Sequence, residues 1–162
     1  MQLPKETIEQ FLFREAEYCD SRNWDAYLEL YDEQCEYHVP QWESETVLTT
    51  DPRTQMSHIY YDDRSGLEDR VYRLRTNKAA SAMPPFRTVH MLSNIRTWPA
   101  ADGNWHAKAN WVTHFYRKGD TGCFFGWSEY TLRPTGESWK IVRKHVVLLN
   151  DNVSHVLDFY HL

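Results

Sequence analysis

Eight histidines are the residues of this chain that most readily suggest metal binding. They form no HExxH motif, and no pair stands beside a carboxylate at the spacing of a facial triad. His106 and His114 share one face of a predicted strand but are too far apart to hold one ion. Hydrogen-bonded histidines are therefore favoured over ligands. The full set is His38, His58, His90, His106, His114, His145, His155 and His161.

Cysteine, glycine and serine motifs are equally uninformative about chemistry. Cys19, Cys35 and Cys123 are an odd number, lie far apart and form no CxxC motif, which favours reduced thiols in a cytoplasmic protein. A Rieske cluster would need two Cys and two His in paired short motifs. The chain has no GxGxxG, GxxxxGK[ST] or GxSxG motif, so nucleotide binding and an esterase-type nucleophile are not indicated.

Acid–base chemistry is what remains, in a cone-shaped cavity between helices and a curled sheet. Asp32, His38, His90 and His145 are the candidates, because each stands among apolar neighbours where desolvation would shift a pKa. The pattern is not specific, since almost any domain of this class offers four such residues.

Composition sets the class of protein. A length of 162 residues predicts one domain, residues 1–162, and a net charge of −5 argues against a nucleic-acid partner. The N-terminus lacks a secretion signal, and no apolar run is long enough to span a membrane. Aromatic residues at 15% exceed what one small core needs, which indicates covered faces or an interface.

The first half of the chain predicts helices. Thr7 and Gln10 fit a capping box before a first helix, and Asn23 is placed to cap a second one with an apolar side of Trp24, Tyr27, Leu28 and Tyr31. A short strand is expected over 36–39 and a long loop over 41–59. The charged stretch Tyr60–Thr76 fits a helix that starts with a capping box of Ser65 and Glu68.

The charges of this third helix have a structural explanation. Asp69 and Arg73 are spaced i,i+4 with the acid first, and metal sites seldom alternate carboxylates with arginines. The helix is therefore expected to show its charges to water or to a partner chain.

The second half predicts strands. Four segments rich in β-branched and aromatic residues, separated by Gly, Asp and Pro turns, predict an antiparallel meander. Helices followed by strands define an α+β fold with the helices on one face of the sheet. In "NWHAKANWVTHFYRK", one face collects Trp105, Ala107, Ala109, Trp111 and Phe115. Phe124 and Phe125 point to opposite faces, so the second face is expected to be partly covered and the chain to be oligomeric.

Several segments together resemble a known family. "FLFREAEYCDSRNWDAYLELYDEQCEYHVPQW", "IYYDDRSGLEDRVYRLRT", "FRTVH" and "LLNDNVSHVLDFYHL" are similar to the small (β) subunit of aromatic-ring-hydroxylating dioxygenases of the benzoate, toluate, anthranilate and 2-halobenzoate group. The resemblance extends from about Glu6 to Leu162.

The resemblance implies an NTF2-like (cystatin-like) cone and an α3β3 hexamer with a large α subunit. The Rieske [2Fe–2S] cluster and the mononuclear Fe(II) would lie on the α subunit, and a separate reductase would supply electrons from NADH. This chain would then have no catalytic, cofactor or metal residues of its own. Its role would be assembly and rigidity, with subunit contacts expected at Arg64, Glu68, Asp69, Arg70 and Arg73.

Two other functions remain open at this stage. The first is a stand-alone isomerase or dehydratase that uses the interior of the cone, because the fold alone excludes neither. The second is a small-molecule binder, for which a large apolar pocket would speak.

Overall fold

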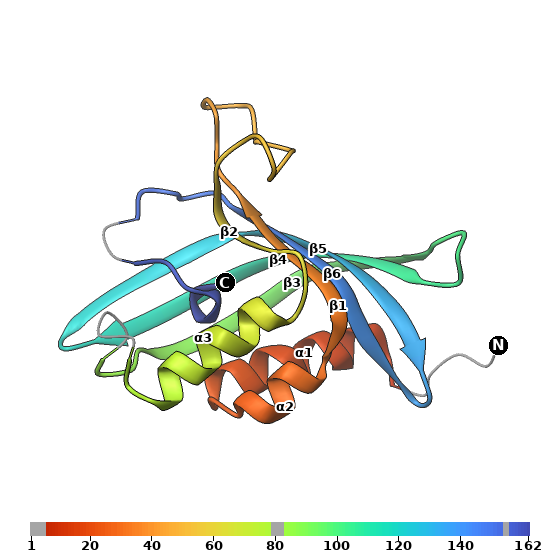
Figure 1. The fold of residues 1–162 in the computed structure, drawn as a ribbon, viewed down its shortest axis with the longest axis horizontal. Helices are drawn as coiled ribbons and strands as arrows, with labels where there is room; N and C mark the ends of the chain where they lie inside the picture. Colours follow the sequence, from red (N-terminus) through yellow and green to blue (C-terminus); the bar gives the residue numbers. More distant parts are fainter. Residues whose placement is uncertain (1–5, 79–82, 154–155) are drawn as a thin grey trace.

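The computed structural model describes residues 6–78, 83–153 and 156–162. Helices lie on one side of a long curved sheet (Figure 1), as the sequence predicts for the α+β class. The helices are α1 (Ile8–Asp20), α2 (Trp24–Glu29), α3 (Ser65–Arg75) and the 3-10 helix η2 (Phe159–His161). The strands are β1 (Tyr31–Pro40), β2 (Ser57–Tyr61), β3 (Arg87–Pro99), β4 (Trp105–Arg117), β5 (Asp120–Thr135) and β6 (Ser138–Leu148).

The sheet has the strand order β2-β1-β6-β5-β4-β3. The predicted meander is confirmed for β3 to β6, which pair antiparallel in sequence order. Its β4–β5 turn places Lys118 and Gly119 at φ 52° and 87°, the left-handed pair that a two-residue hairpin requires. β1 differs, because it pairs parallel with β6. No short turn joins these two strands, so none dictates their relative direction.

The first two helices follow the predicted signals with two corrections. Thr7 and Gln10 form the expected capping box at the start of α1. Asn23 occupies the N-cap position of α2, but its side chain makes no capping hydrogen bond. Tyr31 was predicted to lie on α2, yet this helix ends at Glu29 and Tyr31 opens β1. The predicted short strand over 36–39 is therefore the end of a longer one, and β2 takes the last part of the expected loop.

The predicted capping box of α3 is wrong. Arg64 is the N-cap residue, and its backbone is already helical with φ −65° and ψ −20°. The Ser65 hydroxyl contacts the carboxylate of Asp63 instead, and Glu68 accepts a hydrogen bond from Arg64 Nε at 2.7 Å. The signal failed because the Ser65 hydroxyl bonds to the Asp63 side chain and not to the helix backbone.

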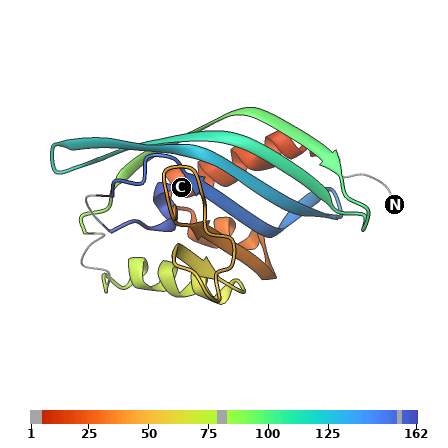
Figure 2. The same cartoon turned by 90° about the horizontal axis from the view of Figure 1, so that it is seen from above.

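One core fills the space between the helices and the sheet. Its sheet side is the predicted face of β4, on which Ala107, Ala109, Trp111 and Phe115 are buried. The segment that contains η2 lies between the sheet and α3 (Figures 1 and 2). Just after β1, Trp42 Nε1 donates to the Leu148 carbonyl at 2.7 Å, which ties the segment after β1 to the end of β6.

Candidate functional site

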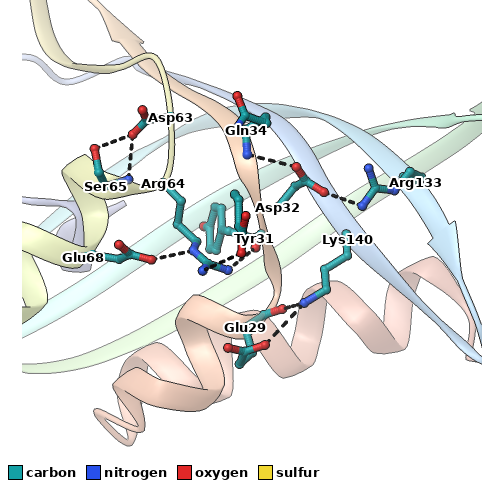
Figure 3. A network of polar contacts seen from close by, with 11 residues as sticks. Glu29, Tyr31, Asp32, Gln34, Asp63, Arg64, Ser65, Glu68, Arg133 and Lys140 are labelled. Atoms are coloured by element: carbon teal, nitrogen blue, oxygen red, sulfur yellow. Dashed lines mark hydrogen bonds and ion pairs between the residues drawn. The ribbon is translucent and has the colours of Figure 1, made fainter.

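The four acid–base candidates do not lie at one site. Asp32, on β1, pairs with Arg133 of β5 and accepts a hydrogen bond from the Gln34 backbone at 2.9 Å (Figure 3). His38 and His145 lie on the outer face of the sheet, whereas His90 lies on the face that carries the helices. These four residues therefore cannot act on one substrate.

His38 and His145 are neighbours on β1 and β6, with ring centroids 5.2 Å apart. Burial lowers the pKa of both imidazoles, and for His145 burial and the nearby Arg143 lower it to about 4. His38 Nε2 lies 3.0 Å from Ser57 Oγ, and Tyr60 packs against the ring edge-on. Both rings are neutral at pH 7, and they pack β1 against β2 and β6.

His90 pairs with a residue that the sequence did not single out. Its Nδ1 lies 2.5 Å from Asp20 Oδ1, and its backbone N–H donates to Asp20 Oδ2 at 2.9 Å. The Thr88 hydroxyl donates to the same carboxylate at 2.9 Å. Burial alone would raise the pKa of Asp20, but the hydrogen bonds from His90 hold that pKa below its ordinary value. The pair ties the end of α1 to β3.

A second polar group lies deeper in the interior. Lys144 Nζ contacts Glu15 Oε1 at 2.7 Å, and the two side chains are only 5% and 4% exposed. The Tyr31 hydroxyl donates to the same oxygen at 2.5 Å and lies 2.9 Å from the Tyr27 hydroxyl. Burial raises the pKa of both tyrosines, so they remain neutral hydrogen-bonding groups. These contacts satisfy one another and leave no ionisable group of this cluster directed at a ligand.

Sequence reasoning missed this cluster, although one signal was present. Glu15 follows Phe11 by four residues and precedes Cys19 by four, so a carboxylate stands on the apolar stripe of α1. Lys144 gave no such signal, because a register shift between β5 and β6 changes which residues of β6 face the helices.

The interior beside Glu15 and His90 offers almost no space for a substrate. The cavity that Glu15, His90 and Tyr130 line has a volume of about 20 Å³, which is room for about one water molecule. Drug-sized ligands occupy cavities of roughly 300–1,000 Å³. The geometry therefore gives no support to an isomerase or dehydratase that would work beside Glu15 and His90.

The five predicted interface residues of α3 divide into two groups. Arg64 and Arg70 are bound within the chain. Arg64 donates to the Tyr31 carbonyl at 3.1 Å (Figure 3), and Arg70 pairs with the buried Asp158 beside η2. The other group is Glu68, Asp69 and Arg73, whose side chains are about half exposed, and Arg73 Nε contacts Asp69 Oδ2 at 3.0 Å.

Apolar side chains remain exposed on the outer face of the sheet. Met91, Val112 and Phe125 are cross-strand neighbours on β3, β4 and β5, and we call them the outer-face row. Met91 is 49% exposed and Phe125 41% exposed. A row of this kind on three adjacent strands is typical of a surface that another chain covers.

Within residues 6–78, 83–153 and 156–162, no three His, Cys, Asp or Glu side chains are grouped as metal ligands. None of the helices in these ranges is long and apolar enough to cross a membrane. In the described part of the chain, therefore, no group of side chains fits as ligands for the iron groups of a dioxygenase.

Comparison with solved structures identifies the fold. An NTF2-like protein with a cystatin-like fold from Novosphingobium aromaticivorans superimposes with a TM-score of 0.61 over 94% of this chain and 87% of its own, at 18% identity. A higher TM-score of 0.81 relates the chain to the β subunit of benzoate 1,2-dioxygenase from Burkholderia mallei, at 33% identity and with full coverage of both chains. The fold is therefore the NTF2-like cone that the sequence predicted.

The family follows from the sequence comparisons. Residues 14–155 match the family described as "Ring hydroxylating beta subunit". The chain is 52% identical to the small subunit of anthranilate 1,2-dioxygenase from Acinetobacter baylyi, over 96% of this chain and 95% of that one. The chain belongs to the ring-hydroxylating β-subunit family, the small subunits of aromatic-ring dioxygenases, and the resemblance seen in the sequence is confirmed.

Proposed function

We propose that this chain, as one domain of residues 1–162, is the non-catalytic structural subunit of the terminal oxygenase of a Rieske non-haem iron dioxygenase. The observation that carries the proposal is the filled interior. Around the paired Glu15 and Lys144 the cone has only about 20 Å³ of space. The outer-face row and the exposed charges of α3 are surfaces that a partner could cover.

The partner is a large α subunit, in an α3β3 complex in which β subunits also contact one another. The α subunit carries the Rieske [2Fe–2S] cluster and the mononuclear Fe(II), and a separate reductase delivers electrons from NADH to it. The complex adds both atoms of O2 to an aromatic carboxylate to give a cis-diol. The identity of 52% to an anthranilate dioxygenase subunit supports a substrate of the anthranilate or benzoate type. Three free cysteines support a cytoplasmic location.

The two groups of α3 residues have different parts in this assembly. Glu68, Asp69 and Arg73 are exposed and can pair with charges of a neighbouring subunit. Arg64 and Arg70 support the same surface from within, because they fix α3 to β1 and to Asp158. The outer-face row supplies apolar area to a second contact.

Co-expression with the large subunit tests the proposal. The purified complex should have the mass of α3β3, and its iron should be lost when the large subunit is omitted. Met91→Glu should abolish assembly, because it places a charge in the outer-face row. Met56→Glu is the matched control, since Met56 is also an exposed methionine, at 70%, but precedes β2 outside this row. Assembly of the Met91 variant at the level of the control would contradict the proposed surface.

Dioxygenase turnover gives the second readout. It should fall in proportion to the amount of intact complex, because the chain supplies no reacting group. A small-subunit chain that turns over an aromatic substrate without the large subunit would overturn the proposed role.

A further inference from the structure

A larger cavity, which shares Cys19 with the small interior one, lies where the end of α1, the start of α2, the end of α3 and the start of β3 meet. Its volume is about 330 Å³, within the range of about 300–1,000 Å³ typical of small-ligand pockets. Trp24, Leu74, Phe86 and Tyr160 form its apolar walls. Burial raises the pKa of Tyr160, so this wall carries no charge at neutral pH. Three aromatic rings around one space favour a planar apolar ligand.

Two arginines line the same cavity. Arg75 Nη2 contacts Asp25 Oδ1 at 2.8 Å, and both side chains are well exposed. Arg22 is exposed and makes no ion pair within the described part of the chain. The charged residues of the lining are thus both arginines, and the Arg22 guanidinium is available to a ligand. A guanidinium binds a carboxylate through two parallel hydrogen bonds, which no neutral group can match.

The backbone holds Arg22 at the end of α1 in the left-handed conformation. α1 ends in a Schellman motif, in which Arg22 N donates to the Cys19 carbonyl at 3.1 Å and Asn23 N donates to the Tyr18 carbonyl at 2.9 Å. This motif needs a left-handed residue, and Arg22 has φ 57°. Glycine is the favoured residue there because a Cβ strains the left-handed conformation. An arginine in that position costs backbone stability relative to glycine.

We propose that this cavity binds a small aromatic carboxylate. The ring lies between Trp24 and Phe86, and the carboxylate pairs with Arg22 and Arg75. The site shares no residue with the subunit contacts proposed above, and it needs no large subunit.

Calorimetric titration of the full chain with benzoate tests the site, with benzyl alcohol as the neutral ligand of similar shape. Benzoate should bind saturably, and benzyl alcohol should bind at least about tenfold more weakly because it forms no bidentate pair. Arg22→Gly should weaken benzoate binding by about tenfold or more. The same variant should have a higher melting temperature, because it relieves the left-handed strain.

Lys118→Gly is the matched control. Lys118 also has a positive φ, of 52°, and its replacement removes the same charge, but it lies in the β4–β5 turn outside the cavity. This variant should also gain stability, yet bind benzoate within about twofold of the unmodified chain. Leu74→Trp should fill the cavity and abolish binding.

Three results would overturn the proposal. They are no saturable benzoate binding at concentrations up to about 10 mM, benzyl alcohol binding as tightly as benzoate, or equal loss of affinity in the Arg22 and Lys118 variants. The titration uses the chain without the large subunit, so its failure would leave the assembly role intact, and failure of assembly would leave this site intact.

Discussion

Two ion pairs of this chain have similar geometry and opposite surroundings. Glu15 and Lys144 meet at 2.7 Å in the interior with side chains at most 5% exposed, whereas Asp69 and Arg73 meet at 3.0 Å on α3 with side chains at least 50% exposed. The charged stretch that dominates the sequence holds the weak pair. Folding depends more strongly on Glu15 and Lys144, which no motif of the sequence singles out. Burial, and not distance, decides how much an ion pair matters to folding.

The buried pair is tolerated because each charge is fully compensated. The Tyr31 hydroxyl donates to the Glu15 carboxylate, and Lys144 Nζ lies 5.7 Å and 5.5 Å from the ring centroids of Tyr37 and Tyr130. Cation–π contacts of this kind strengthen when water is excluded. The exposed pair has no such supporting contacts, and solvent screens it.

Removal of one partner from the buried pair should give the largest effect. Lys144→Ala leaves the Glu15 carboxylate unpaired in the interior, and we expect a loss of about 3–5 kcal/mol in the free energy of unfolding. Denaturant unfolding of the isolated chain measures it. Lys140→Ala is the control on the same strand, since Lys140 pairs with the exposed Glu29, and it should cost less than about 1 kcal/mol. Equal losses in the two variants would refute the contrast between buried and exposed pairs.

A pH titration of stability tests whether His145, on the outer face of the sheet, is buried as the interior residues are. In the unfolded chain the imidazole of His145 titrates near its ordinary pKa of 6.5, but burial and Arg143 lower that pKa to about 4 in the folded protein. Between these values the unfolded state binds the proton and the folded state does not. The free energy of unfolding therefore falls as pH decreases, by about 1–2 kcal/mol at pH 5 after allowance for partial exposure.

The groups that face His145 are His38, Arg143, Glu36 and Glu129, and their balance sets this shift. His145→Gln should remove much of the loss between pH 7 and pH 5. His114→Gln, at an exposed position of the same face, should leave it unchanged. A wild-type chain with equal stability at both pH values would show that the His38–His145 pair is not buried in solution.

The exposed pair should give the smallest effect on folding. Arg73→Ala is expected to change the free energy of unfolding by less than about 0.5 kcal/mol, as exposed i,i+4 pairs do. Its effect on assembly with the large subunit can be much larger, because a neighbouring subunit would desolvate the pair. Gel filtration of the co-expressed complex separates the two cases. Full assembly of the Arg73 variant would show that Arg73 makes no subunit contact and that this part of α3 is only a charged, solvated surface.

The sequence predicted correctly those features that depend only on residues close together in the chain. The Thr7–Gln10 capping box, the long strands and the core face of β4 were predicted because each depends on neighbouring residues or a fixed period. The Ser65 capping box failed because Asp63 competes for the same hydroxyl. Tyr31 was assigned to a helix because its spacing from Tyr27 fits both a helix and a buried strand start.

The sequence by itself determined the α+β class, the family and the absence of recognisable metal and nucleotide motifs, because all three depend on composition, order and local spacing. The tertiary structure alone decided which charges meet. Glu15 and Lys144, Asp20 and His90, and Arg70 and Asp158 are each far apart in the chain and come together only when strands and helices pack. It also decided that the space beside Glu15 and His90 is filled and that an open cavity lies at Trp24 and Arg22. Cavity volume depends on how side chains from distant elements fit together, and no local pattern records that.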